Sequence, residues 1–271
     1  MLRRAAEIVL GPLILRRRLP AVSGEGVIFV SGRVGGLRYL FKPSSRWDPP
    51  LLEAARLLVE PGAVVWDIGS NVGLFAMAAA FHAGPNGQVI AVEADNDAVA
   101  LLSRTCRRHS QAYAPVSVVP VAVGGTPGFV RFAVAKRARA ANSIEGFGST
   151  QTGGTKETRR LPCTTLDAML DAFPPPNVLK VDVEGAELAV LTGGARLLRE
   201  VRPVMHCEVA SENSAEVSRL LRRMDYTLWD AAALASRNVV EVDDAVWNTI
   251  AVPAERKAQF LARVAVRAGQ F

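Results

Sequence analysis

The strongest constraint on the fold is an alternation of short apolar runs with helix-like segments, which begins near residue 50 and continues almost to the end of the chain. The apolar runs are typical of buried strands, and they lie at residues 63–68, 87–94, 116–123, 177–185, 202–209, 226–231 and 246–253. The segments between them carry helical spacing or helix-capping signals, and they lie at residues 51–59, 74–83, 95–110, 187–198 and 213–224. This order predicts an α/β fold with a mostly parallel central sheet and helices on both faces.

Two parts of the chain depart from this alternation. Residues 21–43 are rich in glycine and predict a small β-hairpin, preceded by an N-terminal helix within residues 6–18. Farther along, a short strand precedes a loop over residues 137–160, whose glycine, serine and threonine content is typical of a mobile lid. We therefore expect an appendage over residues 1–49 and one large domain over residues 50–271.

Charge and cysteine content limit the partners of the chain. The formal net charge is +6, but no aromatic residues alternate with the basic clusters, so we do not expect a nucleic-acid partner. The apolar run within residues 6–18 is too short to span a bilayer and is interrupted by Gly11 and Pro12, which leaves peripheral membrane contact as an alternative. Three widely spaced cysteines without a CxxC pair favour a reducing, cytoplasmic location.

The stretch DIGSNVG, residues 67–73, joins a predicted strand to a predicted helix. Glycines at such a turn allow a positive φ and let a ligand approach the backbone closely. The stretch lacks both the GxGxxG pattern of dinucleotide enzymes and the lysine of a phosphate loop. Glu93 follows the next strand, 20 residues after Gly73, at the distance of a carboxylate that binds ribose hydroxyls. Together with Asp67, this pattern favours a ribose-bearing, positively charged cofactor.

Charged residues also end two later strands. Lys180, Asp182 and Glu184 alternate along residues 177–185, so they share one side of the chain as it leaves the sheet. His206 and Glu208 end the following strand. Burying such groups costs free energy unless they are solvated, paired or used in chemistry, so all five are candidate catalytic residues. An acid in the first turn of a helix or a histidine in the core is the structural alternative.

Several of these motifs together resemble the FkbM family of S-adenosylmethionine-dependent methyltransferases. The resemblance covers roughly residues 50 to 252, and it rests on VVWDIGSNVGLFAMAA, VIAVEAD, TTLDAML, LKVDVEGAELAVLTGGARLL and RPVMHCEV in that order. It implies a class I Rossmann-like methyltransferase fold, with a sheet of about seven strands whose last strand is antiparallel.

The resemblance also implies roles for individual residues. Asp67 and Gly69 would form the turn on the methionine side of the cofactor, Asn71 and Gly73 would open the following helix, and Glu93 would hold the ribose. Further cofactor contacts would come from Val121 and Ala122 beside the adenine, and from Asn142 and Ser143 in the ANSI stretch of the predicted lid.

The activity that the resemblance implies is methyl transfer to a small-molecule acceptor, and we expect O-methylation of a hydroxyl on a glycoside, polyketide or related secondary metabolite. A base drawn from Asp182, Glu184, Glu208 or His206 would take the hydroxyl proton. Mg²⁺ bound between Asp182 and Glu208 is an alternative way to activate the hydroxyl. N-methylation and a non-catalytic cofactor-binding module remain the alternative functions.

Overall fold

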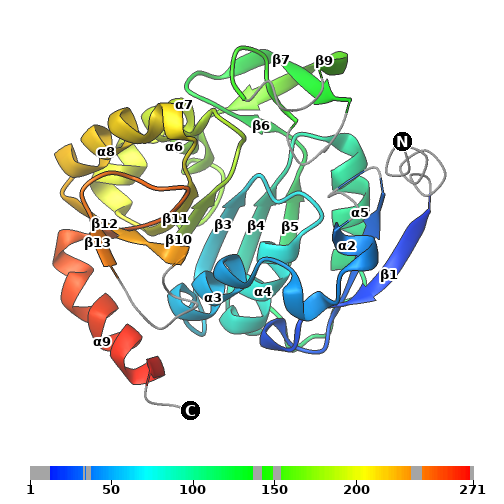
Figure 1. Ribbon diagram of the computed structural model, residues 1–271, viewed down its shortest axis with the longest axis horizontal. Coiled ribbons are helices and arrows are strands. Elements are labelled where there is room, and N and C mark those ends of the chain that lie inside the picture. Colours follow the sequence, from blue (N-terminus) through cyan, green and yellow to red (C-terminus); the bar gives the residue numbers. More distant parts are fainter. Residues whose placement is uncertain are drawn as a thin grey trace.

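The structure is a computed structural model that describes residues 13–32, 34, 38–136, 142–148, 154–232 and 240–268. Its centre is an eight-stranded sheet (Figure 1). The order of the strands across the sheet is β13 (Val240–Val242), β12 (Tyr226–Asp230), β14 (Asn248–Pro253), β11 (Val204–Glu208), β10 (Val178–Val181), β3 (Val64–Ile68), β4 (Gln88–Val92) and β5 (Val116–Val119).

The predicted mostly parallel sheet is confirmed. Strands β5, β4, β3, β10 and β11 run parallel to one another, and β14 lies antiparallel between β11 and β12. The prediction of seven strands is one short, because the three-residue β13 adds an antiparallel edge beside β12. Such a short strand carries too few residues for its alternation to be recognised.

Helices cover both faces of this sheet (Figure 1). One hydrophobic cluster joins the sheet to α3 (Pro49–Leu58), α4 (Leu74–Ala83), α5 (Asn96–Cys106) and α9 (Lys257–Ala268). A second cluster joins the opposite face to α6 (Leu166–Met169), α7 (Glu187–Thr192), the π-helical η5 (Leu197–Val201) and α8 (Ser214–Arg223). The short 3-10 turns η6 (Ser211–Asn213) and η8 (Ala254–Arg256) precede α8 and α9.

The N-terminal region differs from the prediction. Ile14–Arg18 forms strand β1, and residues 6–12 of the predicted helix lie outside the described residues. β1 pairs antiparallel with β2 (Val27–Ser31), so the hairpin begins before residue 21 and encloses η1 (Ala21–Ser23). The side chains of β1 alternate between exposed and half-buried, which is the period of a strand rather than of a helix.

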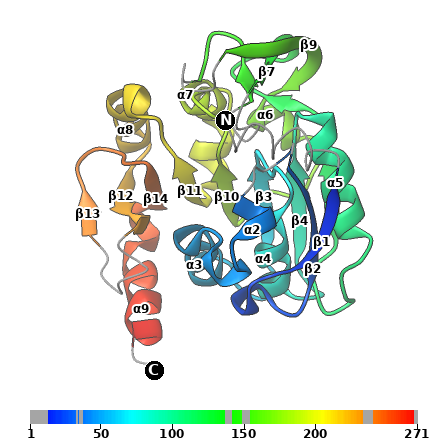
Figure 2. The same cartoon turned by 45° about the vertical axis from the view of Figure 1, so that its right-hand side comes forward.

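This hairpin packs beside α5 (Figure 2). The amide of Phe29 donates a hydrogen bond of 3.0 Å to Thr105 Oγ1, and the Arg104 guanidinium lies over the Phe29 ring. The chain then passes through α2 (Arg38–Phe41) and η2 (Ser44–Arg46) to α3. Ile28 and Trp47 belong to the same hydrophobic cluster as α3 and α4, and the division of the chain at residue 49 stays a prediction.

A smaller, four-stranded sheet lies at one end of the central sheet (Figure 1). Its order is β6 (Ala122–Val123), β9 (Thr155–Thr164), β7 (Gly128–Ala135) and β8 (Ser143–Ile144). The predicted strand at 116–123 is therefore two strands in two sheets, separated at Pro120, which cannot donate a backbone hydrogen bond. The predicted loop over 137–160 is also shorter than expected, because β9 begins at Thr155 and pairs along β7. Residues 137–141 and 149–153 of that loop lie outside the described residues.

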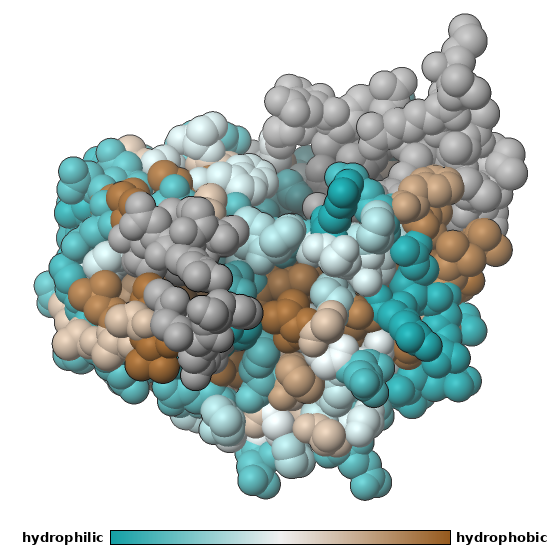
Figure 3. All heavy atoms as spheres, turned by 60° about the horizontal axis from the view of Figure 1, so that its bottom comes forward, coloured by the Kyte–Doolittle hydropathy of each residue, from teal (hydrophilic) through white to brown (hydrophobic). Residues whose placement is uncertain are grey.

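The surface is mixed, with apolar side chains gathered in patches among hydrophilic ones on the face shown in Figure 3. No helix within the described part of the chain is long and apolar enough to cross a membrane. Cys106, Cys163 and Cys207 are all free thiols.

Candidate functional site

The turn between β3 and α4 brings the backbone of two strand ends into close contact. Gly69 has a φ of 79°, and a Cβ atom added to it would lie 1.8 Å from the carbonyl oxygen of Asp182. Gly73 has a φ of 95°, and a Cβ there would lie 2.5 Å from Leu102 Cδ1. Asn71, between them, also has a positive φ, of 51°. Both glycines are therefore required by the geometry of the turn.

A cavity, which we call the first cavity, opens beside this turn between the ends of β3 and β4 and the smaller sheet. It contains six residues that the sequence predicts at a cofactor site: Gly69, Asn71, Glu93, Val121, Ala122 and Asn142. It is also lined by residues that the sequence analysis missed or assigned elsewhere, which are Ile68, Val92, Ala94, Asp95, Ala98, Val123, Phe132, Ile144, Asp182, Val183 and Glu184. The apolar part of this wall comes from both sheets, so the smaller sheet is one side of the cavity.

Glu93 links the turn after β3 to the segment between β4 and α5. Its carboxylate accepts hydrogen bonds of 2.7 Å from the amides of Asn71 and Asp95. Burial raises the pKa of Glu93 to about 7, although these two amides act in the opposite direction. A carboxylate has about four lone-pair sites, so two remain for hydroxyl groups in the cavity.

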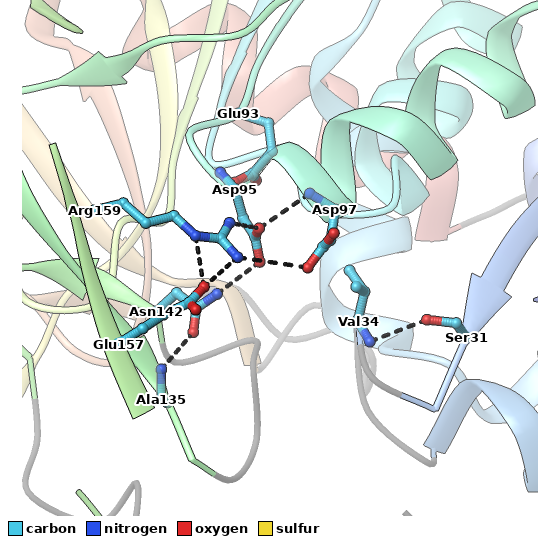
Figure 4. Close-up of polar contacts among 9 residues, drawn as sticks. All are labelled: Ser31, Val34, Glu93, Asp95, Asp97, Ala135, Asn142, Glu157 and Arg159. Carbon is cyan, nitrogen blue, oxygen red and sulfur yellow. Dashed lines mark hydrogen bonds and ion pairs between the residues drawn. The ribbon is translucent and has the colours of Figure 1, made fainter. Parts of the chain in front are cut away.

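Asp95 connects the central domain to the smaller sheet (Figure 4). Its side chain caps α5 by accepting a hydrogen bond from Asp97 N, and it also accepts one of 2.7 Å from Asn142 Nδ2 and one of 3.1 Å from Arg159 Nη1. Asn142 Oδ1 accepts a hydrogen bond of 2.8 Å from the amide of Ala135. Asn142 thus holds the end of β7 against α5. The sequence indicates only that Asp95 is a helix cap, not that it receives side chains from residues far along the chain.

Three other predicted cofactor residues do not line the first cavity. Asp67 is fully buried, with Oδ1 3.2 Å from the Lys180 ammonium. Gly73 is held against Leu102, as described above. Ser143 is buried and donates a hydrogen bond to the carbonyl oxygen of Phe147. None of these three residues lines the first cavity, so their predicted contacts with the cofactor stay predictions.

Lys180 joins the ends of β3 and β10. Its ammonium donates a hydrogen bond of 2.7 Å to the carbonyl oxygen of Gly69 and lies 3.2 Å from a carboxylate oxygen of both Asp67 and Asp182. Burial alone would lower its pKa, but the surrounding carboxylates raise it above the ordinary value for lysine. Burial raises the pKa of Asp67, and Lys180 opposes that shift. The ammonium therefore stays charged and forms ion pairs with both Asp67 and Asp182.

A second cavity lies on the other side of the same turn. Four residues line both cavities: Gly69, Asn71, Asp182 and Glu184. The rest of the second cavity consists of Tyr39, Asp48, Leu51, Ser70, Val72, Leu74, Phe75, Lys180, Glu208, Trp247 and Asn248. Burial raises the pKa of Glu208 to about 8, and the nearby Asp182 adds to this shift. The predicted catalytic residues Lys180, Asp182, Glu184 and Glu208 are therefore brought together on one surface.

His206 is not part of that surface. It is fully buried on β11, its ring stacks on Phe75, and neither ring nitrogen has a hydrogen-bond partner. Burial lowers its pKa to about 4, so the ring is neutral near pH 7. Because it lines neither cavity, its position does not support the predicted role as a base.

The strand-end acids give little support to the Mg²⁺ site considered from the sequence. Asp182 follows β10 and Glu208 ends the adjacent β11, as predicted, but Asp182 already binds the Lys180 ammonium. No group of three or more metal-ligating side chains occurs among the residues that the structure describes. The described residues therefore give no support to a Mg²⁺ ion held between Asp182 and Glu208.

The sequence analysis missed the outer wall of the second cavity. Tyr39, Asp48 and Leu51 reach it from α2 and α3, and Trp247 and Asn248 reach it from the start of β14. None of these residues belongs to a motif, and only the folded chain brings them together. Asp48 has a positive φ of 42°, which no sequence pattern predicts.

Comparisons with known proteins relate the chain to methyltransferases. Residues 67–230, more than half of the chain, match the family described as "Methyltransferase FkbM domain". The hexuronic acid methyltransferase AglP of Haloferax volcanii is 30% identical over 174 residues, which cover 62% of this chain and 66% of AglP.

Two solved structures are similar at lower identity. The methyltransferase FkbM from Methylobacillus flagellatus KT is 15% identical with a TM-score of 0.44, and the match covers 74% of this chain and 50% of that one. The precorrin-6y C5,15-methyltransferase from Geobacter metallireducens GS-15 is 16% identical with a TM-score of 0.41, covering 66% and 71%. The chain thus spans just under two thirds of AglP and half of the Methylobacillus protein.

Proposed function

The chain belongs to the FkbM methyltransferase family, and on this premise we propose that it transfers the methyl group of S-adenosylmethionine to a hydroxyl group of a glycoside, polyketide or related secondary metabolite. The observation that carries the proposal is that the two cavities meet at Gly69, Asn71, Asp182 and Glu184. Methyl transfer requires two ligands whose reacting atoms touch, and two cavities that share a wall satisfy this requirement.

The residues of the first cavity fit the cofactor. The free lone pairs of Glu93 suit the ribose hydroxyls, and the apolar surface of Val121, Ala122 and Phe132 suits an adenine ring. S-adenosylmethionine supplies an electrophilic methyl group on a sulfonium centre. The carboxyl groups of Asp182 and Glu184 line both cavities, where they would stabilise the positive charge of the sulfonium centre by electrostatic attraction.

In the second cavity we assign the general base to Glu208. A base works best when its pKa lies close to the operating pH, and the pKa of Glu208 is raised to about 8. Asp182 instead forms an ion pair with the Lys180 ammonium. Glu208 would accept the proton of the acceptor hydroxyl as the new oxygen–carbon bond forms, and the buried Lys180 would hold Asp182 and the Gly69 turn in place.

Calorimetry and a turnover assay test the proposal in sequence. The purified chain should bind S-adenosylmethionine and S-adenosylhomocysteine. It should bind NAD at least about 100-fold more weakly, because the turn between β3 and α4 lacks the GxGxxG pattern that binds a pyrophosphate. Incubation with a panel of hydroxylated acceptors should then release S-adenosylhomocysteine and give a product heavier by one methylene, with equal rates in EDTA and in Mg²⁺. Tighter binding of NAD would refute the reaction class, and methylation only of amines would replace the O-methyl assignment by N-methylation.

A further inference from the structure

The three consecutive arginines of β1 differ in what they contact. Side chains alternate along a strand, so Arg17 points to the opposite side of β1 from Arg16 and Arg18. The half-buried Arg17 donates hydrogen bonds to the carbonyl oxygens of Tyr39 and Leu40 in α2. Arg16 and Arg18 are exposed. Arg17 therefore fastens β1 to α2, whereas its two neighbours lie at the surface.

Strand pairing places Arg16 beside a side chain that α5 also reaches. Arg16 is paired with Phe29 of β2, and the side chains of two directly opposite residues lie on the same face of an antiparallel sheet. The Arg104 guanidinium lies 4.3 Å from the centre of the Phe29 ring. Arg16 and Arg104 therefore lie beside the same aromatic side chain, although one belongs to β1 and the other to α5 (Figure 2).

Two further arginines continue this group at the end of α5. They follow Arg104 by three and four residues, the spacing of neighbouring side chains on a helix. We call the five exposed arginines the basic surface, and they are Arg16, Arg18, Arg104, Arg107 and Arg108. Cations near the C-terminus of a helix are favourable by themselves, which accounts for the three on α5 but not for the two on β1.

The positive charge of the basic surface is not balanced by neighbouring acids. Within the part of the chain that the structure describes, none of the five arginines forms an ion pair, although such pairs occur at many arginines elsewhere. Glu25, the acid of the hairpin, lies near Tyr113, and burial and Glu25 both raise the pKa of Tyr113. Asp97 of α5 lies 3.7 Å from Arg159. The basic surface can therefore attract an anionic partner.

Apolar side chains border the basic surface at the start of β1. Ile14 alternates with Arg16 and Arg18, so it lies on their side of the strand, and it is 45% exposed. Leu13, directly before the strand, is 46% exposed. Exposed aliphatic side chains suit the boundary between the headgroups and the acyl chains of a bilayer. A nucleic acid would instead need aromatic rings on which its bases can stack, and Phe29 is buried.

We propose that the basic surface, together with Leu13 and Ile14, docks the protein on a membrane that contains anionic lipids. The arginines would meet the negative headgroups, and the two aliphatic side chains would enter the boundary below them. Because Arg17 joins β1 to α2, which contributes Tyr39 to the second cavity, docking would hold that cavity near the membrane. The inference does not depend on the proposed function.

Co-sedimentation of the full chain with lipid vesicles tests the inference. One set of vesicles is phosphatidylcholine alone, and in the other set about a third of the lipid is phosphatidylglycerol. The chain should bind the anionic vesicles at least about tenfold more tightly than the neutral ones. Binding should weaken as the salt concentration is raised, since the attraction is electrostatic. Equal binding to both sets, or no binding to either, would overturn the proposal.

Matched double variants assign the contact to the basic surface, because a chain with a net charge of +6 attracts anions over much of its surface. Arg16→Gln combined with Arg18→Gln should weaken binding to anionic vesicles about tenfold or more. The control is Arg199→Gln combined with Arg223→Gln, which removes the same charge from exposed positions on η5 and α8. It should change binding less than about twofold. Equal losses in both double variants would indicate attraction by net charge alone and would overturn the docking surface.

Two further measurements test the apolar contact and the class of partner. Ile14→Ser keeps every charge and should weaken binding to anionic vesicles about threefold or more; unchanged binding would remove the aliphatic contact. Fluorescence anisotropy with a single-stranded RNA should give affinities that the two double variants reduce equally. RNA binding that depends on Arg16 and Arg18, without binding to anionic vesicles, would replace the membrane by a nucleic acid. Thermal melting confirms that each variant is folded.

Discussion

The first and second cavities share four lining residues but differ in the groups that their acidic side chains contact. In the first cavity, Glu93 and Asp95 each accept hydrogen bonds from backbone amides, and Asp95 also binds Asn142 and Arg159. Among the described residues that line the second cavity, the buried Lys180 ammonium forms ion pairs with Asp67 behind it and with Asp182. The first cavity thus has a polar wall that backbone amides preorganise, whereas the second is organised around an ion-paired ammonium.

The two cavities also differ in where their residues lie along the chain. Every residue that lines the first cavity falls within residues 67–230, whereas the second draws five residues from outside that range. Under the proposed function, the cofactor side would lie wholly within the family region, whereas the acceptor side would draw part of its wall from outside it. Such a division would let members of one family differ in substrate.

The largest effect is expected from replacing Lys180, which joins the ends of β3 and β10. Lys180→Met should lower the free energy of unfolding by about 3–5 kcal/mol, because it leaves Asp67 buried without its counter-charge. Urea denaturation followed by circular dichroism measures this loss. Adding Asp67→Asn to Lys180→Met should recover part of it, because the uncompensated charge is then gone. A loss below about 1 kcal/mol would show that Lys180 is not needed to hold the two strand ends together.

Glu208 tests whether the second cavity carries the chemistry. Glu208→Gln should slow methyl transfer by about 100-fold while the affinity for S-adenosylhomocysteine changes less than about twofold. In the unmodified chain the rate should rise with pH up to about 8, because the carboxyl group must lose its proton to act as a base. The variant should lose this pH dependence. Full turnover in Glu208→Gln, with Glu212→Gln as the exposed control, would transfer the role of base to another residue.

The sequence locates much of the first cavity because the signals for that cavity are local. The turn around Gly69 and Gly73, and the position of Glu93 after the next strand, each follow from short-range patterns of strand, glycine and acid. Alternation likewise places Lys180 and Asp182 together at the end of β10. The number of residues between these signals is fixed by the geometry of a strand and its helix, so the pattern can be recognised without a structure.

The rest depends on contacts between distant segments. Tyr39, Asp48 and Trp247 meet only because α2, α3 and the start of β14 converge on the same strand ends, and nothing in their neighbouring residues indicates this. The helix expected within residues 6–18 is partly a strand because β2 offers it a partner, which outweighs local helical propensity. The polar content of residues 155–158 favours a loop, but pairing with β7 makes them part of β9.

Glu93 tests the cofactor side alone. Glu93→Gln should weaken binding of S-adenosylmethionine by about 1.5–3 kcal/mol, because an ionised hydrogen-bond acceptor is lost. Binding to the unmodified chain should strengthen as pH rises from about 6 to 8, since the pKa of Glu93 is raised to about 7 and the ionised form accepts the stronger hydrogen bonds. Calorimetry measures both effects, with Glu216→Gln on the exposed face of α8 as the control. Equal affinities for the variant and the unmodified chain would remove Glu93 from the ribose site.

The smallest effect on cofactor affinity is expected from replacing Asn142 or Ser143, two neighbouring residues beside the first cavity. Asn142→Ala removes the hydrogen bonds to Ala135 N and Asp95 Oδ2, so the smaller sheet keeps its contact with Asp95 through Arg159 but loses the one at the end of β7. We expect cofactor binding to weaken by about 1 kcal/mol, which is roughly fivefold. Ser143→Ala removes only the hydrogen bond to the carbonyl oxygen of Phe147, and its effect should be smaller, because the Ser143 side chain does not line the cavity. Calorimetric titration of both variants decides between a wall that is held by Asn142 and a direct contact from Ser143. If Ser143→Ala costs as much as Asn142→Ala, the hydroxyl of Ser143 contacts the cofactor and the smaller sheet must move when the cofactor binds.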